Sequence, residues 1–445
     1  MKRWLFERTD NITLILFRIF YGFLMAAESF GAISTGWVRR TLIEPQFTFN
    51  FIGFDWLQPL PGWGMYAYFA LMGIAGLCIM VGYRYRLATF SFAILWTGVY
   101  LMQKTSYNNH YYLMVLLGFI MAFLPANRDL SVDAHRNPAL RRQDMSRGIL
   151  VLIIAQLAIV YTYASVAKLY ADWLDFSFLK LLMESKKDLP VIGAFLQQDW
   201  VHTAMGIFGL VFDGLVIWAL LYKPTRKIAF GLSIFFHLFN SYVFQIGIFP
   251  YLSLAFCVFF FPAEELRNWF RLARTEELAE GTPEIPKHSQ WSLPLIGVYL
   301  VIQLLLPLRH FTIKEPVIWT EEGHRMSWRM MLRSRNGHIS FRVKDKNTGE
   351  MALVKLEDYL TRKQMRKVAT YPDFAWQFAQ RLKREYEAKG LEVEIYAQGR
   401  VSINRNTPYP LIDPEVDLAQ AKWDYFFHNE WILPYPEIEV ENASE

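Results

Sequence analysis

Long apolar runs constrain this chain more than any other feature of its sequence. The run at residues 148–167, GILVLIIAQLAIVYTYASVA, is long enough to cross a bilayer as a helix. Nine segments of this kind occur before residue 310. They are residues 11–33, 64–83, 87–103, 109–124, 148–168, 204–222, 227–243, 248–262 and 291–308. The sequence therefore predicts a polytopic helical membrane domain with about nine spanning segments, of which 109–124 and 248–262 are short.

Composition supports this class and divides the chain in two. Hydrophobic residues make up 53% of the chain and charged residues only 20%, both displaced from the values of soluble proteins. From residue 310 onward the chain is instead charged and interrupted by Pro and Gly. We expect a mostly α protein, with a transmembrane domain over residues 1–309 followed by a small α+β soluble domain over residues 310–445.

The tail has the alternation of a small folded domain. HISFRVKDKNTGEMALVKL predicts two strands around a turn at residues 347–349, and LEVEIYAQGRVSIN predicts a further long strand or a hairpin. Residues 358–389 predict one or two amphipathic helices, interrupted at Tyr371-Pro372. The chain shows no basic patch interleaved with aromatic residues, so a nucleic-acid partner is not expected. It also lacks metal-ligand spacing, so no metal is expected.

Basic residues are distributed unevenly between the loops. If all nine segments cross, one set of loops contains seventeen Lys and Arg residues and the other contains six. The richer set is Lys2, Arg3, Arg8, Arg84, Arg86, Arg128, Arg136, Arg141, Arg142, Arg147, Lys223, Arg226, Lys227, Arg267, Arg271, Arg274 and Lys287. The positive-inside rule then predicts a multi-pass protein with a cytoplasmic N-terminus and an extracytoplasmic C-terminal domain.

Three polar groups interrupt the apolar segments at one predicted depth. They are Asn108-Asn109-His110 at the head of the fourth segment, Lys168 at the end of the fifth, and His237 with Asn240 inside the seventh. With this topology and a helical rise of about 1.5 Å per residue, all three fall near the outer surface. Ionisable groups inside a membrane are costly and are typically functional.

Each of these groups also has a purely structural interpretation. Lys168 could be a snorkelling anchor that pairs with Asp172 one helical turn later. His110, next to two tyrosines, is also typical of an interfacial aromatic belt. His237 is harder to explain in this way, because it lies inside an apolar stretch, IFFHLFN, with no end of the segment nearby.

Five stretches together resemble the vitamin K-dependent γ-glutamyl carboxylase family, in a bacterial-type form with an HTTM-type membrane domain. They are TSYNNHYYLMVLLGFIMAFLPANRDLSVDAHR, VAKLYADW, FFHLFNSYVFQIGIFPY, WTEEGHRMSWRMMLRSR and VSINRN with LIDPEVDLAQAKW, in the order of the family. The resemblance implies a membrane lyase that oxygenates reduced vitamin K, a menaquinol- or phylloquinol-type hydroquinone, to its epoxide. This reaction generates a strong base that drives carboxylation of glutamate with CO2. O2 and CO2 would be co-substrates, and membrane lipid, membrane quinone and a glutamate-containing protein or peptide would be partners.

The resemblance also implies roles for individual residues. Lys168 occupies the family's catalytic-lysine position and would deprotonate the hydroquinone. His110 would be catalytic with it, Asn109 would bind the quinone oxygens, and His237 and Asn240 would line the same pocket.

The tail match differs from the family at its glutamate-binding segment. Residues 322–326, just before Ser327 and Trp328, are EGHRM, where animal enzymes have Gly-Leu-Tyr-Gly-Tyr. The resemblance implies that Ser327 and Trp328, which follow this segment, are the candidate substrate-binding residues. Two other functions stay open: a quinol epoxidase or monooxygenase that does not carboxylate glutamate, and a non-enzymatic membrane carrier or lipid-binding protein.

Overall fold

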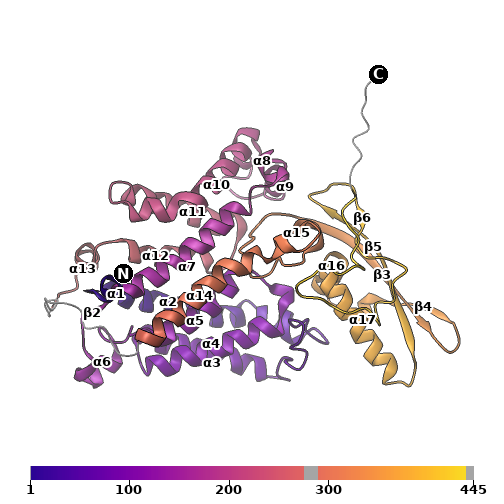
Figure 1. Cartoon of the computed structure of the whole chain (residues 1–445), viewed down its shortest axis with the longest axis horizontal. Coiled ribbons are helices and arrows are strands. Elements are labelled where there is room, and N and C mark those ends of the chain that lie inside the picture. The colour runs from indigo at the N-terminus through magenta and orange to yellow at the C-terminus, as the bar shows by residue number, and fades with distance from the viewer. Residues whose placement is uncertain (1, 275–288, 437–445) are drawn as a thin grey trace. The chain divides into compact units, whose positions relative to one another are not determined.

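The computed structural model describes residues 2–274 and 289–436 and is mostly helical (Figure 1). Lys287, which was counted in the loop charge, and residues 437–445 lie outside the described part. The chain divides into two compact units. We call Met1–Leu169 with Lys186–Leu304 the membrane unit, and Tyr170–Ser185 with Leu305–Glu445 the C-terminal unit.

Helices dominate the membrane unit. They are α1 (Lys2–Phe6), α2 (Ile12–Ser34), α3 (Gly64–Val81), α4 (Tyr85–Met102), α5 (Asn109–Phe123), α6 (Val132–Arg136), α7 (Arg147–Val166), α10 (Asp199–Leu221), α11 (Arg226–Phe244), α12 (Phe249–Phe256), α13 (Ala263–Phe270) and α14 (Ser289–Leu305). Two short strands, β1 (Arg8–Asp10) and β2 (Asp144–Ser146), pair antiparallel.

The prediction of a polytopic helical domain is confirmed. By length and composition, six helical stretches of the described chain could cross a bilayer: α2, α3, α7, α10, α11 and Gln290–Thr312, which includes all of α14 except its first residue. The remaining three predicted spans are also helices, namely α4, α5 and α12.

Small residues bring α2 and α3 close together. A Cβ atom on Gly22 would lie 2.3 Å from the backbone nitrogen of Met80, and one on Gly76 would lie 2.5 Å from that of Ala26. Neither distance is sterically possible, so both positions need glycine for the backbones to approach. Close backbone contact of this kind stabilises helix pairs in lipid, where the hydrophobic effect contributes little.

One buried arginine ties α2 to the loop after α5. Arg18 is fully buried, and its guanidinium donates to the carbonyl oxygens of Ala126, Asp129 and Leu130 at 2.8, 3.2 and 2.6 Å. Since a buried guanidinium must find acceptors for its N–H groups, these bonds explain how a charged residue is accommodated within an apolar helix.

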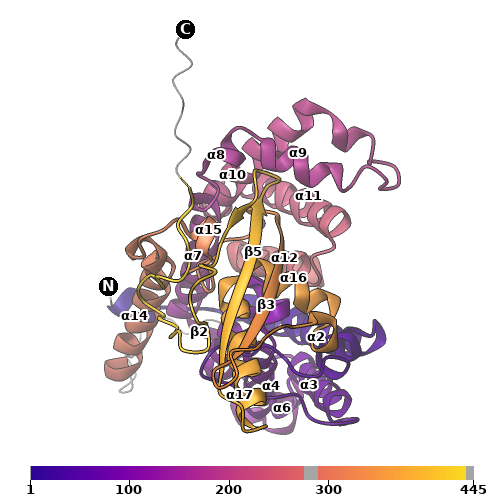
Figure 2. The ribbon, with the colours of Figure 1, turned by 90° about the vertical axis from the view of Figure 1, so that its right-hand side faces the viewer.

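The C-terminal unit is built on a four-stranded sheet of order β4-β3-β5-β6. Its elements are α8 (Ala171–Leu174), α9 (Ser177–Glu184), α15 (Val317–Thr320), β3 (Arg335–Asp345), β4 (Met351–Leu353), α16 (Arg362–Thr370), α17 (Pro372–Glu387), β5 (Val393–Ile403) and β6 (Tyr409–Pro410). The predicted hairpin is confirmed as β3 and β4, and the predicted further strand as β5, which lies beside β3 (Figure 2). The two long strands pair antiparallel from Arg335↔Ile403 to Asp345↔Val393.

Local sequence sets the ends of the helices that cover this sheet. Thr361 and Gln364 form a capping box at the start of α16, and Pro372 begins α17, where its missing N–H costs nothing. The ring of Phe341 on β3 meets that of Phe378 on α17 edge-on, with centroids 5.1 Å apart and both side chains fully buried. The sheet is thus covered by two separate helices, and the interruption predicted at Tyr371-Pro372 is confirmed.

The segment Tyr170–Ser185 belongs to the C-terminal unit although it follows α7 directly in the chain. Asn404 donates to the Asp172 carboxylate at 2.6 Å, and Arg405 forms an ion pair with Glu184. These contacts fasten α8 and α9 to the end of β5.

Candidate active site

Lys168 lies two residues beyond the last residue of α7 and is almost completely buried, with 6% of its surface exposed. Its Nζ donates to the carbonyl oxygen of Ala164 at 3.0 Å and to the carboxylate of Asp213. The side chain therefore does not extend to solvent as a snorkelling anchor would. Its carboxylate partner is Asp213 on α10, whereas Asp172 accepts a bond from Asn404.

Asp213 is a functional candidate that the sequence reasoning missed. It is 7% exposed and lies in the middle of α10, within the apolar run GIFGLVFDGLVIW. The available signal was the same one that singled out His237, because an ionisable residue far from either end of a spanning helix requires a partner.

His237 on α11 is buried and lies close to α7. Its Nε2 is 3.0 Å from the hydroxyl of Tyr161, which precedes Lys168 by seven residues, or two helical turns, on α7. The ring of Phe212, the neighbour of Asp213, meets both the His237 ring and the Tyr161 ring, at centroid distances of 5.9 and 6.4 Å. Lys168, Asp213, Tyr161 and His237 thus belong to one packed region of α7, α10 and α11.

His110 joins this region through Phe249 at the start of α12. The His110 ring stacks on the Phe249 ring at 5.3 Å, and the His237 ring meets the same phenylalanine edge-on at 6.3 Å. The two histidines, predicted from separate segments of the sequence, therefore contact one aromatic side chain.

The amides predicted to bind the quinone have different environments. Asn109 is buried and accepts a hydrogen bond from the Tyr107 hydroxyl at 3.0 Å. Its neighbour Asn108 caps α5 by accepting from the backbone N–H of Tyr111 at 2.8 Å. Asn240 is half-buried and lies one turn after His237 on α11. We refer to Asn109, His110, Lys168, Asp213, His237 and Asn240 as the polar cluster.

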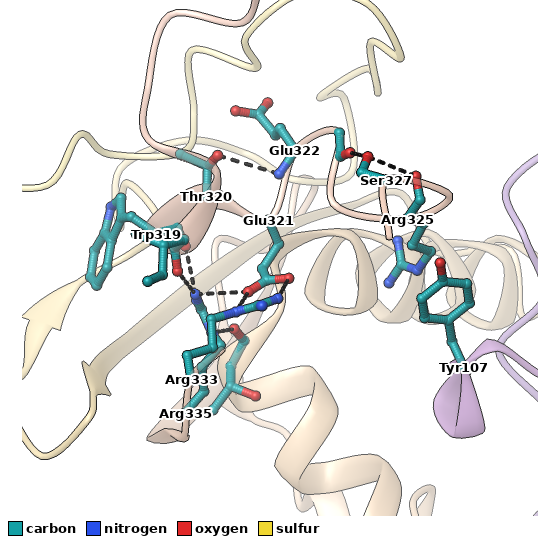
Figure 3. Close-up of polar contacts among 12 residues, drawn as sticks. Tyr107, Trp319, Thr320, Glu321, Glu322, Arg325, Ser327, Arg333 and Arg335 are labelled. Carbon is teal, nitrogen blue, oxygen red and sulfur yellow. Dashed lines mark hydrogen bonds and ion pairs between the residues drawn. The ribbon is translucent and has the colours of Figure 1, made fainter. Parts of the chain in front are cut away.

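In the C-terminal unit, the segment that contains Ser327 and Trp328 is packed into the interior. Trp328 is 1% exposed, and Ser327, which is 2% exposed, donates its hydroxyl hydrogen to the carbonyl oxygen of Gly323 (Figure 3). A role for these two residues in substrate binding stays a prediction. Their burial means that they shape the segment rather than present side chains at its surface.

Arginines surround this segment, and several contact buried carboxylates. Arg333 and Arg335 both bind Glu321, and Arg335 also donates to the carbonyl oxygens of Ile318 and Trp319 at 2.8 Å (Figure 3). Burial and the neighbouring charge of Arg333 lower the pKa of Arg329 to about 10, so Arg329 still carries its positive charge at neutral pH. Residues 309–335 contain five arginines and one lysine against three glutamates, so this stretch carries a net positive charge.

Internal contacts also fix the residues that differ from the family's glutamate-binding segment. The buried carboxylate of Glu322 accepts from the backbone N–H and the side-chain amide of Asn429, at 2.9 and 2.8 Å. It also lies 2.7 Å from Nδ1 of His428. Among the residues that the structure describes, no group of three His, Cys, Asp or Glu side chains could hold a metal ion.

Comparison with known families matches both parts of the chain. The model for the HTTM domain matches residues 6–265, which is more than half of the chain. The model for the vitamin K-dependent gamma-carboxylase, lumenal domain, matches residues 288–438. No solved structure matches the chain. With both domains present in this order, together with helices able to span a bilayer, the chain is an integral membrane protein that belongs to the vitamin K-dependent γ-carboxylase family.

Proposed function

We propose that the protein couples oxygenation of a reduced naphthoquinone to carboxylation of glutamate, with residues 1–309 as the catalytic membrane domain and residues 310–445 as an extracytoplasmic domain. The observation that carries this proposal is the buried Lys168 amine, held between Ala164 and Asp213 and packed in the same region as His110 and His237. A buried lysine within a membrane domain is costly even when it is paired, and a family whose reaction needs a protected base gives it a use.

The polar cluster fits a hydroquinone on the chemistry of its side chains. Aromatic rings of Phe212 and Phe249 flank the two histidines, and the amides and imidazoles can donate to or accept from phenolic oxygens. When bound and oxidised by O2, the hydroquinone would supply the strong base that removes the glutamate γ-hydrogen before CO2 adds.

The protein's residues then have distinct tasks. Lys168 takes the proton of the quinol hydroxyl at Nζ. Asn109 and His110 hydrogen-bond the quinone oxygens, with His110 also assisting the carbon dioxide step, and His237 and Asn240 line the same site. The apolar helices around them exclude water, which would otherwise quench a strong base.

The arginine-rich segment supports a substrate that carries carboxylates. Arg329 is cationic and half-buried, and it lies next to Ser327 and Trp328 in the sequence. A glutamate-containing peptide is the anionic substrate that the family assignment implies.

One observation favours quinol epoxidation without carboxylation as a second candidate. Glu322, in the segment that differs from the family, is bound to His428 and Asn429 within the C-terminal unit. Glu322 is therefore buried within the unit and is not presented to a peptide substrate.

The two candidates predict different products from one incubation. Purified protein in lipid nanodiscs would be supplied with reduced menaquinone, O2, labelled CO2 and a glutamate-rich peptide. We expect epoxide together with label in the peptide. Epoxide without label, across several glutamate peptides, would select the second candidate. Absence of epoxide from folded protein would refute both.

The topology can be tested with two matched cysteine variants. In a protein lacking Cys78 and Cys257, we expect Asn347→Cys, in the exposed turn after β3, to react with an impermeant maleimide in intact cells. Asn137→Cys, in the exposed loop between α5 and α7, should react only after permeabilisation, because the positive-inside rule places that loop in the cytoplasm. Labelling of both from the same side would contradict the predicted odd number of crossings.

A further inference from the structure

We propose that Asp213 is the positioning residue of the catalytic amine: it orients Nζ of Lys168 and supplies the negative charge that the amine needs when it takes a proton. The inference rests on the proposed function, since it assigns a partner to the same base. In the proposed function Asp213 contacts neither quinone nor peptide, and it acts only through Lys168.

The geometry gives Asp213 its orienting role. A neutral amine has two N–H bonds and one lone pair. Nζ of Lys168 has the Ala164 carbonyl oxygen and the Asp213 carboxylate as acceptors on two different helices, α7 and α10. These two acceptors hold Nζ in place from two helices, and the nitrogen lone pair is the electron pair that must face the quinol hydroxyl.

The charge of Asp213 gives it a second role. When Nζ takes the proton, the quinol O–H bond breaks, its electron pair stays on oxygen, and a third N–H bond forms on nitrogen. The Lys168–Asp213 pair thereby changes from a net charge of −1 to neutral. In a medium of low dielectric, an ammonium without a nearby carboxylate would be strongly disfavoured, so the negative charge of Asp213 favours the step in which Nζ takes the proton.

Other titratable groups surround this end of α7, and they set the background for the pH test. They include Tyr161 on α7 itself and, on elements packed against α7 or α10, His237, Cys257 and Tyr299. The Tyr161 hydroxyl interacts electrostatically with both Asp213 and Cys257, and Tyr299 bonds to Gln156, further toward the start of α7. Asp213 is a charged group in direct contact with Nζ, so its removal should have a large effect on the pH profile.

The alternative is an ion pair with a structural role only. Breaking a buried pair by removing one partner is strongly destabilising in general. If the pair has only a structural role, removing the Asp213 carboxylate would lower the amount of folded protein. The pH dependence of the enzyme that still folds would be unchanged. The pH profile separates the two roles.

The experiment measures the rate of quinol oxidation against pH for Asp213→Asn, Asp213→Glu and a control, Asp199→Asn, at the exposed start of the same helix. Asparagine keeps an oxygen acceptor near Nζ and removes the charge. We expect the acid limb of the kcat profile to move to lower pH, because the ammonium loses its counter-charge. We also expect the plateau of kcat to fall by about 10- to 100-fold, less than the about 10²–10⁴-fold of losing a general base outright.

Three further outcomes complete the test. Asp213→Glu should return the acid limb toward the wild-type pH, Asp199→Asn should match the wild type, and KM for quinol should change little in all variants. An Asp213→Asn enzyme with the wild-type pH profile and a reduced folded fraction would overturn the proposal. Absence of quinol oxidation in the wild type would instead refute the proposed function, so the two failures are distinguishable.

Discussion

Lys168→Ala should reduce quinol oxygenation by about 10²–10⁴-fold, the range that a positioned general base contributes. The truncation removes Nζ while leaving its two acceptors, the Ala164 carbonyl oxygen and the Asp213 carboxylate. Small primary amines added to the assay should therefore bind between them and restore part of the rate. The measurement is epoxide formation by purified protein. Lys187→Ala, at an exposed position of the same unit, serves as the control.

The histidines provide the competing assignment, since imidazole can also act as a base near neutral pH. His110→Ala and His237→Ala should weaken quinol binding or the later steps while leaving residual epoxide formation. If Lys168→Ala retained near-normal epoxidation and His110→Ala lost it, the roles assigned to these side chains would be reversed.

Glu321→Gln should destabilise the C-terminal unit by about 3–5 kcal/mol, the usual result of removing one partner from a buried ion pair. Arg333 and Arg335 share this carboxylate, and all three side chains are less than 10% exposed. The substitution keeps the size of the side chain but leaves two buried guanidinium groups without their counter-charge. Hydrogen exchange of the β3 and β5 amides reports the local free energy of unfolding directly.

A matched control lies on α17 of the same unit. Glu385 pairs with Arg381 at 3.2 Å, four residues apart, and both side chains are about one-third exposed. Glu385→Gln should therefore have little effect, as is usual for solvated pairs. Adding Arg333→Met to Glu321→Gln should recover part of the lost stability, because one of the two uncompensated charges is then removed. Equal exchange rates in Glu321→Gln and Glu385→Gln would contradict this account.

The sequence predicted the fold well wherever periodicity alone determines an element. Each of the nine apolar segments is a helix, because a run of apolar side chains has only one way to satisfy its backbone in lipid. The alternation in HISFRVKDK and VEIYAQGRV likewise predicted β3 and β5, which pair along their whole length. The contacts of α8 and α9 with the end of β5 were not predictable. The pattern of a short helix does not indicate which residues it contacts more than two hundred positions later.

The candidate site was predictable residue by residue but not as a set of contacts. Lys168, His110 and His237 were identified because polar residues in apolar segments require an explanation. Their connection through Asp213, Tyr161 and Phe249 depends on how α5, α7, α10, α11 and α12 pack. Helical spacing suggested Asp172 as the partner of Lys168, since it lies four residues on. The chain instead leaves α7 before Lys168 and carries Asp172 into the other unit.

The division of the C-terminal unit between two stretches of chain has a consequence for biosynthesis. Asp172 and Glu184 are made 232 and 221 residues before Asn404 and Arg405, the side chains that hold them. During synthesis of α10, α11, α12 and α14, Tyr170–Ser185 is already present but cannot yet contact Asn404 and Arg405. Such long-range contacts form late in folding. Because Lys168 lies only two residues before this segment, the chain beside Lys168 is among the last parts to be secured. A chain that ends before Asn404 and Arg405 therefore lacks the contacts that secure the segment after α7.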